Sequence, residues 1–227
     1  MPSQKELELE KLKENILKMG GFVEDAIRKS IRTLVERDRD LALQVIDGDA
    51  IVNTFDVEIE EECIKFLALW QPTGSNLRFV TTAIKIITDL ERMGDLAVDI
   101  CERSVELLDE PPLKPYIDIP RMAEASQKML KDSLDAFVAK DADLAMQVCK
   151  ADDFVDNLNH QIFNELLLFM LKDPKNISRA VRLTYIAKYL ERVADHATNI
   201  AEMVVYMVKG KVIRHMACET MRKTPES

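Results

Sequence analysis

The chain has few residues that break helices. Only 6 of its 227 residues are glycine and 8 are proline, which is about half of average usage. This scarcity argues against strand-rich folds with many tight turns, and residues 121–173 contain neither residue. Alanine, glutamate, lysine, leucine and arginine are abundant, which is typical of long helices.

Long apolar runs and closely spaced cysteines are also missing. The N-terminal residues lack the apolar core of a signal peptide. The longest apolar run is Leu166–Leu171, far short of the roughly 18 residues of a membrane span. The four cysteines lie at least 38 residues apart, so no close pair is present to hold zinc or exchange disulfides. We therefore expect reduced thiols in a cytoplasmic protein. The cysteines are Cys63, Cys101, Cys149 and Cys218.

Basic residues are in the minority. The chain has 31 lysines and arginines against 40 acidic residues, a net charge of −9. Nucleic-acid binding depends largely on basic side chains that displace counterions from phosphates, so this balance disfavours a nucleic-acid partner. Hydrophobic residues make up 47% of the chain, enough to bury a core.

The positions of the few breakers predict an all-α fold of six long helices. We expect helices over residues 4–37, 39–70, 76–109, 119–139, 141–172 and 175–209. Asp118, just before Ile119 and Pro120, is expected in the N-cap region of the fourth helix, because proline is tolerated in a first turn. The strongest break predicts a first bundle over 1–110, a proline-rich linker over 111–118, a second bundle over 119–210 and a tail over 211–227.

The two halves are copies of one unit. DLALQV at 40–45 matches DLAMQV at 143–148 with an offset of 103, and LER at 90–92 matches 190–192 with an offset of 100. The turn WQPTGSN in the first copy is longer than KDPKN in the second, which accounts for the difference. We therefore predict two tandem three-helix up-down-up bundles, each with its own core.

Acidic side chains form narrow stripes on the predicted helices. At 100° per residue, Glu91, Asp95 and Asp99 span an arc of about 80° that points away from the apolar arc, and Glu102 and Glu106 continue it. The preceding helix carries a second stripe of Asp49, Asn53 and Asp56. Oxygen-bearing residues recur at the matching positions of the second copy: Asp152, Asp156, Asn159, Glu191, Asp195 and Asn199.

This pattern favours a metal site. Like charges at i and i+4 destabilise a helix, and a cation would remove that cost. Carboxylate and amide oxygens on neighbouring helices suit Mg²⁺, Ca²⁺, Mn²⁺ or iron, and bridging carboxylates could hold several ions. Solvated acidic surfaces are the alternative. His196, at the edge of a stripe, is either a further ligand or a surface side chain.

Motifs for catalysis are missing. The histidines are not in Glu-x-x-His or His-Glu-x-x-His patterns, so the ligands of di-iron and zincin sites are absent. There is also no glycine-rich phosphate loop and no recognisable nucleophile with a base. We therefore expect a protein that is not an enzyme.

The two stripe motifs carry a family resemblance. TDLERMGDLAVDI at 88–100 and LERVADHATNIAE at 190–202 are similar to the paired signature of the PhoU family of phosphate-uptake regulators, and VIDGDAIVN at 45–53 agrees with it. The resemblance implies two three-helix bundles whose surfaces bind multinuclear metal clusters, with iron first and manganese, zinc, magnesium or calcium as alternatives. The residues it implicates are Glu91, Asp95, Asp99, Glu191, Asp195 and Asn199, with Asp49, Asn53, Asp152 and Asp156 as partners.

The resemblance also implies a role. Members of the family restrain the phosphate ABC transporter and keep its membrane sensor kinase inactive when phosphate is plentiful. It implies a cytoplasmic metal-binding adaptor, often a homodimer, that reaches the membrane through protein partners. Two other readings stay open: a carboxylate-metal enzyme of the helical-bundle type, and a metal-buffering or purely structural bundle. Asn53 and Asn199 depart from the acidic residues of the other copy, so the two sites are expected to differ in charge.

Overall fold

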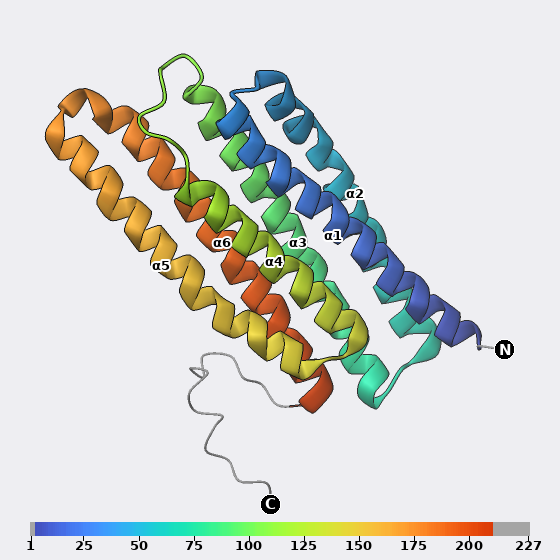
Figure 1. The fold of residues 1–227 in the computed structure, drawn as a ribbon. Helices are drawn as coiled ribbons and strands as arrows, with labels where there is room; N and C mark the ends of the chain where they lie inside the picture. The colour runs from blue at the N-terminus through green and yellow to red at the C-terminus, as the bar shows by residue number, and fades with distance from the viewer. Residues whose placement is uncertain (1–2, 211–227) are drawn as a thin grey trace, which may run out of the picture.

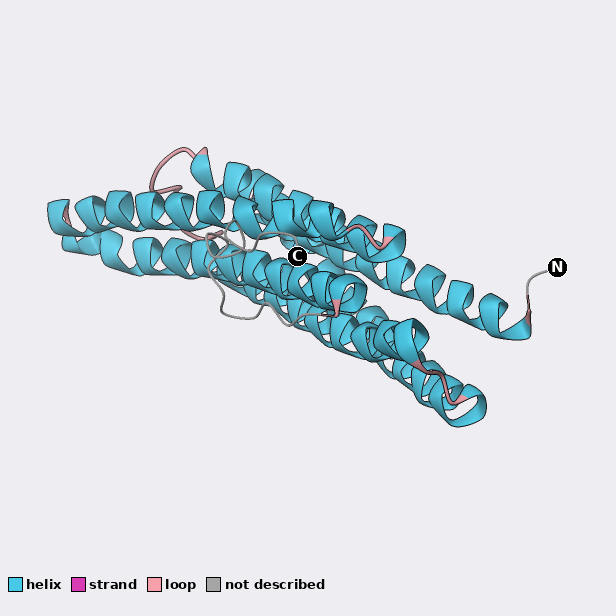
Figure 2. Ribbon diagram, turned by 90° about the horizontal axis from the view of Figure 1, so that it is seen from below, coloured by secondary structure: helices cyan, strands magenta, loops and turns pink. Residues whose placement is uncertain are grey.

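The computed structural model describes residues 3–210, which form six long helices joined by short connections, with no strand in that range (Figure 2). The predicted all-α architecture of six helices is confirmed. None of these helices is long and apolar enough to cross a membrane. The predicted tail, with Cys218, lies outside the described residues. The elements are α1 (Gln4–Glu36), α2 (Arg39–Trp70), α3 (Gly74–Glu106), α4 (Asp118–Ala139), α5 (Ala142–Lys172), the 3₁₀ turn η1 (Pro174–Asn176) and α6 (Ile177–Lys209).

The first turn of each half has the same construction. Arg37 and Lys140 end their helices in the left-handed conformation, with φ of 58° and 55°. Residues other than glycine rarely adopt this backbone conformation. Its recurrence at an offset of 103 residues shows that the turn itself is duplicated. Asp38 and Asp141 follow, and each carboxylate accepts hydrogen bonds from backbone N–H groups in the first turn of the next helix.

The start of α4 differs from the sequence-based expectation. Ile117 occupies the N-cap position, no side chain caps the helix, and Asp118 is its first helical residue. The Asp118 carboxylate instead accepts a hydrogen bond of 3.4 Å from Gln161 Nε2 on α5. The carboxylate that was expected to cap α4 therefore forms a tertiary hydrogen bond with α5 instead.

The two halves pack through their first and third helices (Figure 1). α3 runs antiparallel to α6, with the Arg78 Nε donating to the carbonyl of Met207 near one end (3.0 Å) and Arg182 pairing with Glu106 near the other (2.6 Å). α1 lies beside α4, while α2 and α5 lie on the outer sides of the molecule. Buried side chains from all six helices form one continuous hydrophobic core, so the prediction of a separate core in each bundle is wrong.

An ion pair is also duplicated. Lys11 Nζ lies 2.5 Å from Glu62 Oε1, and the residues 103 positions later, Lys114 and Glu165, form the same pair. Lys11 lies on α1, whereas Lys114 lies in the linker between the halves. The linker therefore takes, in the second half, the place that the first turns of α1 take in the first half.

Candidate metal-binding faces

The structure pairs the acidic stripes within each half. On the first acidic face, Asp49 of α2 lies close enough to Asp95 of α3 for the negative charge of Asp95 to raise the pKa of Asp49. Asn53 Nδ2 donates a hydrogen bond of 2.9 Å to Asp49 Oδ2. Arg92 lies at the edge of this face, 3.4 Å from the Glu91 carboxylate and 3.5 Å from that of Asp95. The first acidic face comprises Asp49, Asn53, Asp56, Glu91 and Asp95.

A glycine lets the two helices approach at this face. A Cβ atom on Gly94 would lie 2.9 Å from Asp49 Oδ1 and 3.3 Å from Val52 Cγ1. The matching residue of the second half is Ala194, which is fully buried. The sequence carries this signal as a very small residue immediately before Asp95 and Asp195, but the acidic stripes are defined by charge alone and do not reveal it.

The second acidic face lies on α5 and α6 and comprises Asp152, Asp156, Glu191 and Asp195. Burial, followed by the charges of the nearby carboxylates of Asp156 and Asp195, raises the pKa of Asp152 to about 6. Asp152 Oδ1 is buried and accepts no hydrogen bond from any described residue. Lys188 forms an ion pair with Glu191 at the edge of the face. Asp195 also has a raised pKa, first through burial and then through Glu191.

Carboxylates of the first half also have raised pKa values. Burial raises the pKa values of Asp49, Asp56 and Glu91, and neighbouring carboxylates raise each of them further. Burial also raises the pKa of Asp99, followed by the charges of Glu102 and Asp95. Both faces therefore hold negative charge that the protein's own cations neutralise only in part, and a bound cation would relieve it.

The donor set fits a hard cation chemically. Carboxylate and amide oxygens are the ligands that such ions prefer, and the unpartnered Asp152 Oδ1 is an available donor. The side chains stand apart as they are placed: within residues 3–210, no three histidine, cysteine, aspartate or glutamate side chains converge as a ready metal site.

Comparison with known proteins identifies the family. The PhoU domain model matches residues 16–104 and 119–204, one match in each half. The chain belongs to the PhoU family. It is 44% identical over 208 residues to the phosphate-specific transport system accessory protein PhoU homolog of Aquifex aeolicus, covering 92% of this chain and 94% of that protein. It is 34% identical over 216 residues to PhoU of Escherichia coli, covering 95% and 90%.

Solved PhoU structures have the same fold. The crystal structure of PhoU from Pseudomonas aeruginosa superposes with a TM-score of 0.88 at 38% identity, covering 92% of this chain and all of that one. The phosphate transport system regulatory protein PhoU from Streptococcus pneumoniae superposes with a TM-score of 0.86 at 31% identity, covering 92% and 99%. The match to a PhoU fold therefore extends over both repeats.

The remaining residues of the PhoU stripes lie at the edges of the faces. Asn199 Nδ2 donates to Asp89 Oδ1 of α3 at 3.5 Å, and His196 Nδ1 lies 2.8 Å from the same oxygen. Asp89 thus connects the second motif to the first half. The acidic stripe on α3, which does not include Asp89, did not predict this contact. Asn159 is half-buried on α5, and its side chain forms no hydrogen bond with the residues described.

Arginines occupy the end of the α3 stripe. Arg103 pairs with Glu102 at 3.3 Å and also with Glu106, which Arg182 of α6 contacts as well. Arginines of α3 and α6 therefore neutralise Glu106, whereas Glu102, within the described chain, pairs only with Arg103 of its own helix. Within the PhoU motif, the carboxylates with incomplete neutralisation are those nearer the centre of the helix.

The raised pKa of Asp152 predicts a pH-dependent cost. With a pKa of about 6 in the folded state against 3.8 as the reference value, the folded protein holds this proton over a range where the unfolded chain has lost it, so stability falls as pH rises from about 4 to about 6. After a discount for solvent screening, Asp152→Asn should raise the free energy of unfolding of metal-free protein at pH 7.5 by about 1 kcal/mol. Urea denaturation with a chelator present measures it.

The increase in the free energy of unfolding caused by Asp152→Asn should be smaller at pH 4.5, because Asp152 is then largely protonated in the folded wild-type protein. Asp153→Asn, at the exposed neighbouring position, is the control: it removes only one of the weaker charges that raise the pKa of Asp152, so the gain in stability should be clearly smaller than that of Asp152→Asn. Equal effects of the two substitutions at both pH values would refute the conclusion that the Asp152 carboxylate lowers stability when it is ionised.

The close approach at Gly94 predicts a contrast between two glycines within helices. Gly48→Ala should raise the free energy of unfolding by about 0.5–1 kcal/mol, because alanine favours helix and a Cβ at Gly48 meets nothing within 4 Å. Gly94→Ala should yield none of this gain, since its Cβ displaces the Asp49 carboxylate or Val52. Parallel urea denaturations test this contrast, and equal gains at both positions would contradict it.

Proposed function

We propose that this chain is a regulator of phosphate uptake that acts by binding partner proteins and does not catalyse a reaction. The observation that carries the proposal is the match to the PhoU domain in both halves, together with relatives named as accessory proteins of the phosphate-specific transport system. Its partners are the phosphate ABC transporter and the associated sensor kinase. It works in the cytoplasm, as a homodimer, and reaches the membrane through these partners.

Metal binding at the two acidic faces is part of the proposal. The first acidic face would hold metal through Asp49, Glu91 and Asp95, with Asn53, Asp56 and Asp99 beside them. The second would hold it through Asp152, Asp156, Glu191 and Asp195, with Asn159 and Asn199 beside them. Iron in a multinuclear cluster is the first candidate, with manganese, zinc, magnesium or calcium as alternatives. The raised pKa values on both faces support the proposal, because they report negative charge that lacks compensation.

The metal would change what each face attracts. A bound metal supplies positive charge, with which a face could dock an acidic segment of a partner. Without metal, the same carboxylates repel that segment. The helices provide the rigid support, so the proposed control is electrostatic and needs no change of fold.

Metal content should divide between the faces. Glu91→Gln with Asp95→Asn should remove the metal of the first acidic face, and Glu191→Gln with Asp195→Asn that of the second, because each pair loses two charged ligands. Elemental analysis of natively purified protein measures the metal per chain. Glu102→Gln, which changes an arginine-paired glutamate, should retain wild-type content. Wild-type protein with no more metal than both double variants would refute the metal assignment.

Deletion of the gene should derepress phosphate-uptake genes in phosphate-rich medium, because the proposed restraint on the transporter and sensor kinase is lost. A reporter fused to a phosphate-starvation promoter measures this, and the wild-type gene should restore repression. Unchanged reporter activity after deletion would refute the regulatory role, whatever the metal content.

A further inference from the structure

The seam between α5 and α6 continues past the second acidic face as a double row of apolar side chains. The two helices are antiparallel and are joined by the short turn η1, so the end of α5 lies beside the start of α6. This register, followed back from the turn along both helices, places three pairs of apolar residues at matching heights on the two sides of the seam. These pairs are Phe163 with Tyr185, Leu167 with Val181, and Leu171 with Ile177, and we name the six residues the apolar seam.

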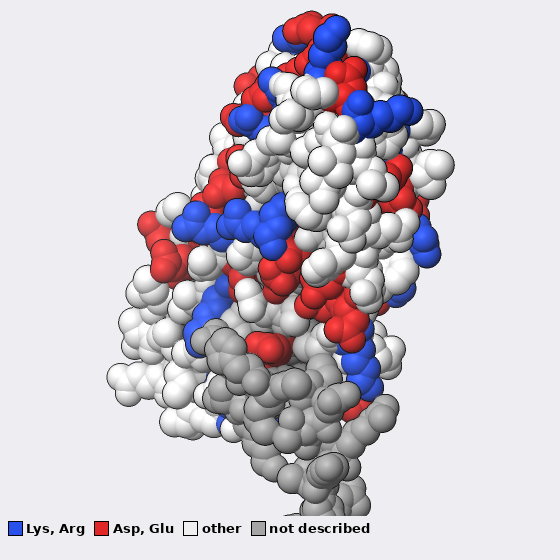
Figure 3. Space-filling view, turned by 90° about the vertical axis from the view of Figure 1, so that its left-hand side faces the viewer, with Lys and Arg blue, Asp and Glu red and all other residues white. Residues whose placement is uncertain are grey.

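The apolar seam is open to solvent. Its residues are each between 37% and 75% exposed. On each helix they are spaced i, i+4 and i+8, so they form a ridge on either side of the seam. On the side of the molecule that carries α5, Figure 3 shows an area free of charged side chains next to an acidic group. Apolar patches of this kind, bordered by polar residues, mark sites of interaction.

The fold does not require these apolar residues. The offsets between the copies place Glu60 opposite Lys85, Ile64 opposite Thr81, and Ala68 opposite Leu77 in the first half. α2 and α3 therefore pack in the same arrangement with charged or small residues at several of the matching positions. The first copy keeps apolar residues at only three of the six matching positions, Ile64, Ala68 and Leu77, so the continuous apolar seam belongs to the second copy.

The charge around the apolar seam is opposite to that of the whole protein. Residues 163–188 contain five basic and two acidic residues, whereas the matching residues 60–88 contain three of each. Lys172 and Lys175, at the α5–α6 turn, are exposed and form no ion pair with any described residue. An occupant of the apolar seam with acidic residues near this turn would be complementary to them.

We propose that the apolar seam binds an amphipathic helix of a partner protein, with the apolar face of that helix between the two ridges and its acidic residues over Lys172 and Lys175. Two parallel ridges on packed helices form the groove into which a third helix fits. An anionic membrane fits less well, because the second acidic face lies at the other end of the seam and would repel it. Binding at the seam does not require metal.

A synthetic peptide tests the proposal. The probe is a fluorescein-labelled 18-residue helix with leucines at i, i+4, i+7 and i+11 and glutamates at one end, measured by fluorescence anisotropy against the full chain with a chelator present. Val181→Glu and Leu167→Glu should each weaken binding at least tenfold, because each buries an unpaired carboxylate. Lys172→Glu with Lys175→Glu should also weaken it, and a lysine-ended peptide should bind more weakly than the glutamate-ended one.

Leu168→Glu is the matched control. Leu168 is 66% exposed on the same helix, but about 100° around it from Leu167 and away from the seam, so binding should be unchanged. Circular dichroism of every variant checks that the helices persist. Equal loss with Leu168→Glu and Leu167→Glu, or equal binding of the two peptides, would overturn the proposal.

Two further outcomes would assign the apolar seam to another occupant. Sedimentation with phosphatidylglycerol–phosphatidylcholine vesicles that is lost in Val181→Glu, without peptide binding, would mean a membrane surface. Self-association in analytical ultracentrifugation that is lost in the same variant, again without peptide binding, would mean a second copy of the chain. Either result overturns the proposed helix.

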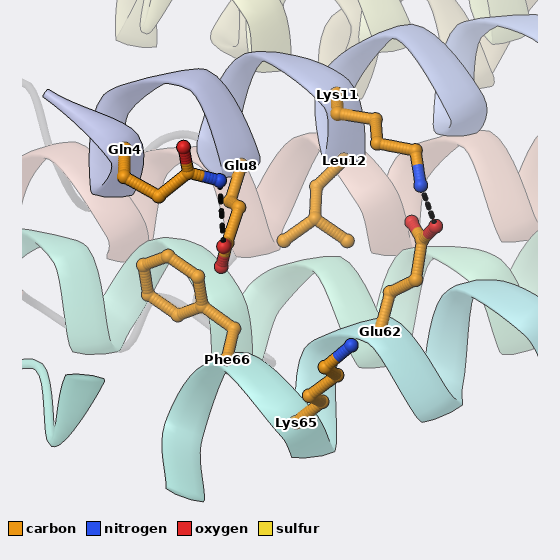
Figure 4. Close-up of a pocket in the computed structure, with 7 residues that line it drawn as sticks. All are labelled: Gln4, Glu8, Lys11, Leu12, Glu62, Lys65 and Phe66. Atoms are coloured by element: carbon orange, nitrogen blue, oxygen red, sulfur yellow. Dashed lines mark hydrogen bonds and ion pairs between the residues drawn. The ribbon is translucent and has the colours of Figure 1, made fainter. Parts of the chain in front are cut away.

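A hollow elsewhere in the described chain lies between the first turns of α1 and the end of α2 (Figure 4). Leu12 and Phe66 form its floor, and the Lys11–Glu62 pair spans one side. Since that ion pair recurs in the second half, we assign this hollow to the construction of the fold.

Discussion

The antiparallel packing of α3 against α6 is the contact on which the rest of the structure depends. It joins the halves, and it places the two copies of the family motif on neighbouring helices that run in opposite directions. Each motif therefore turns its carboxylates toward its own outer helix, α2 or α5, and the two faces cannot merge into one cluster.

Local periodicity explains what could be predicted from the sequence. Helix ends, the repeat and the acidic stripes depend on residues a few positions apart, so a single sequence contains them. The pairing of stripes within each half was not predictable in this way, since it depends on which helices lie side by side. The contact between Asp89 and His196 was missed for the same reason, because it joins side chains 107 residues apart.

The duplicated ion pair is visible in the sequence as a repeat, but its residues belong to no recognisable motif. Lys11 and Glu62 recur at the 103-residue offset as Lys114 and Glu165, although one lysine lies in a helix and the other in the linker. Asp118 shows the converse. Its position before a proline is typical of a cap, but a contact with α5 decides where its carboxylate lies.

The two copies use one fold at different electrostatic cost. On the first acidic face, Asn53 donates a hydrogen bond to Asp49 and Arg92 lies near two carboxylates. On the second, Asp156 replaces the amide, and Asp152 retains a buried oxygen without a partner. The same copy exposes the apolar seam, where the first copy has Glu60 and Lys85. Burying a carboxylate without a partner and exposing apolar side chains both reduce stability.

Stability alone does not account for such costs when the other copy shows how to avoid them, which directs attention to binding. The acidic residues of the proposed helix would lie over Lys172, about 24 Å along α5 from Asp156. This separation exceeds the Debye length of about 10 Å, so the two proposed sites of the α5–α6 hairpin act largely independently of one another. The first half supplies the rigid support against which α6 packs.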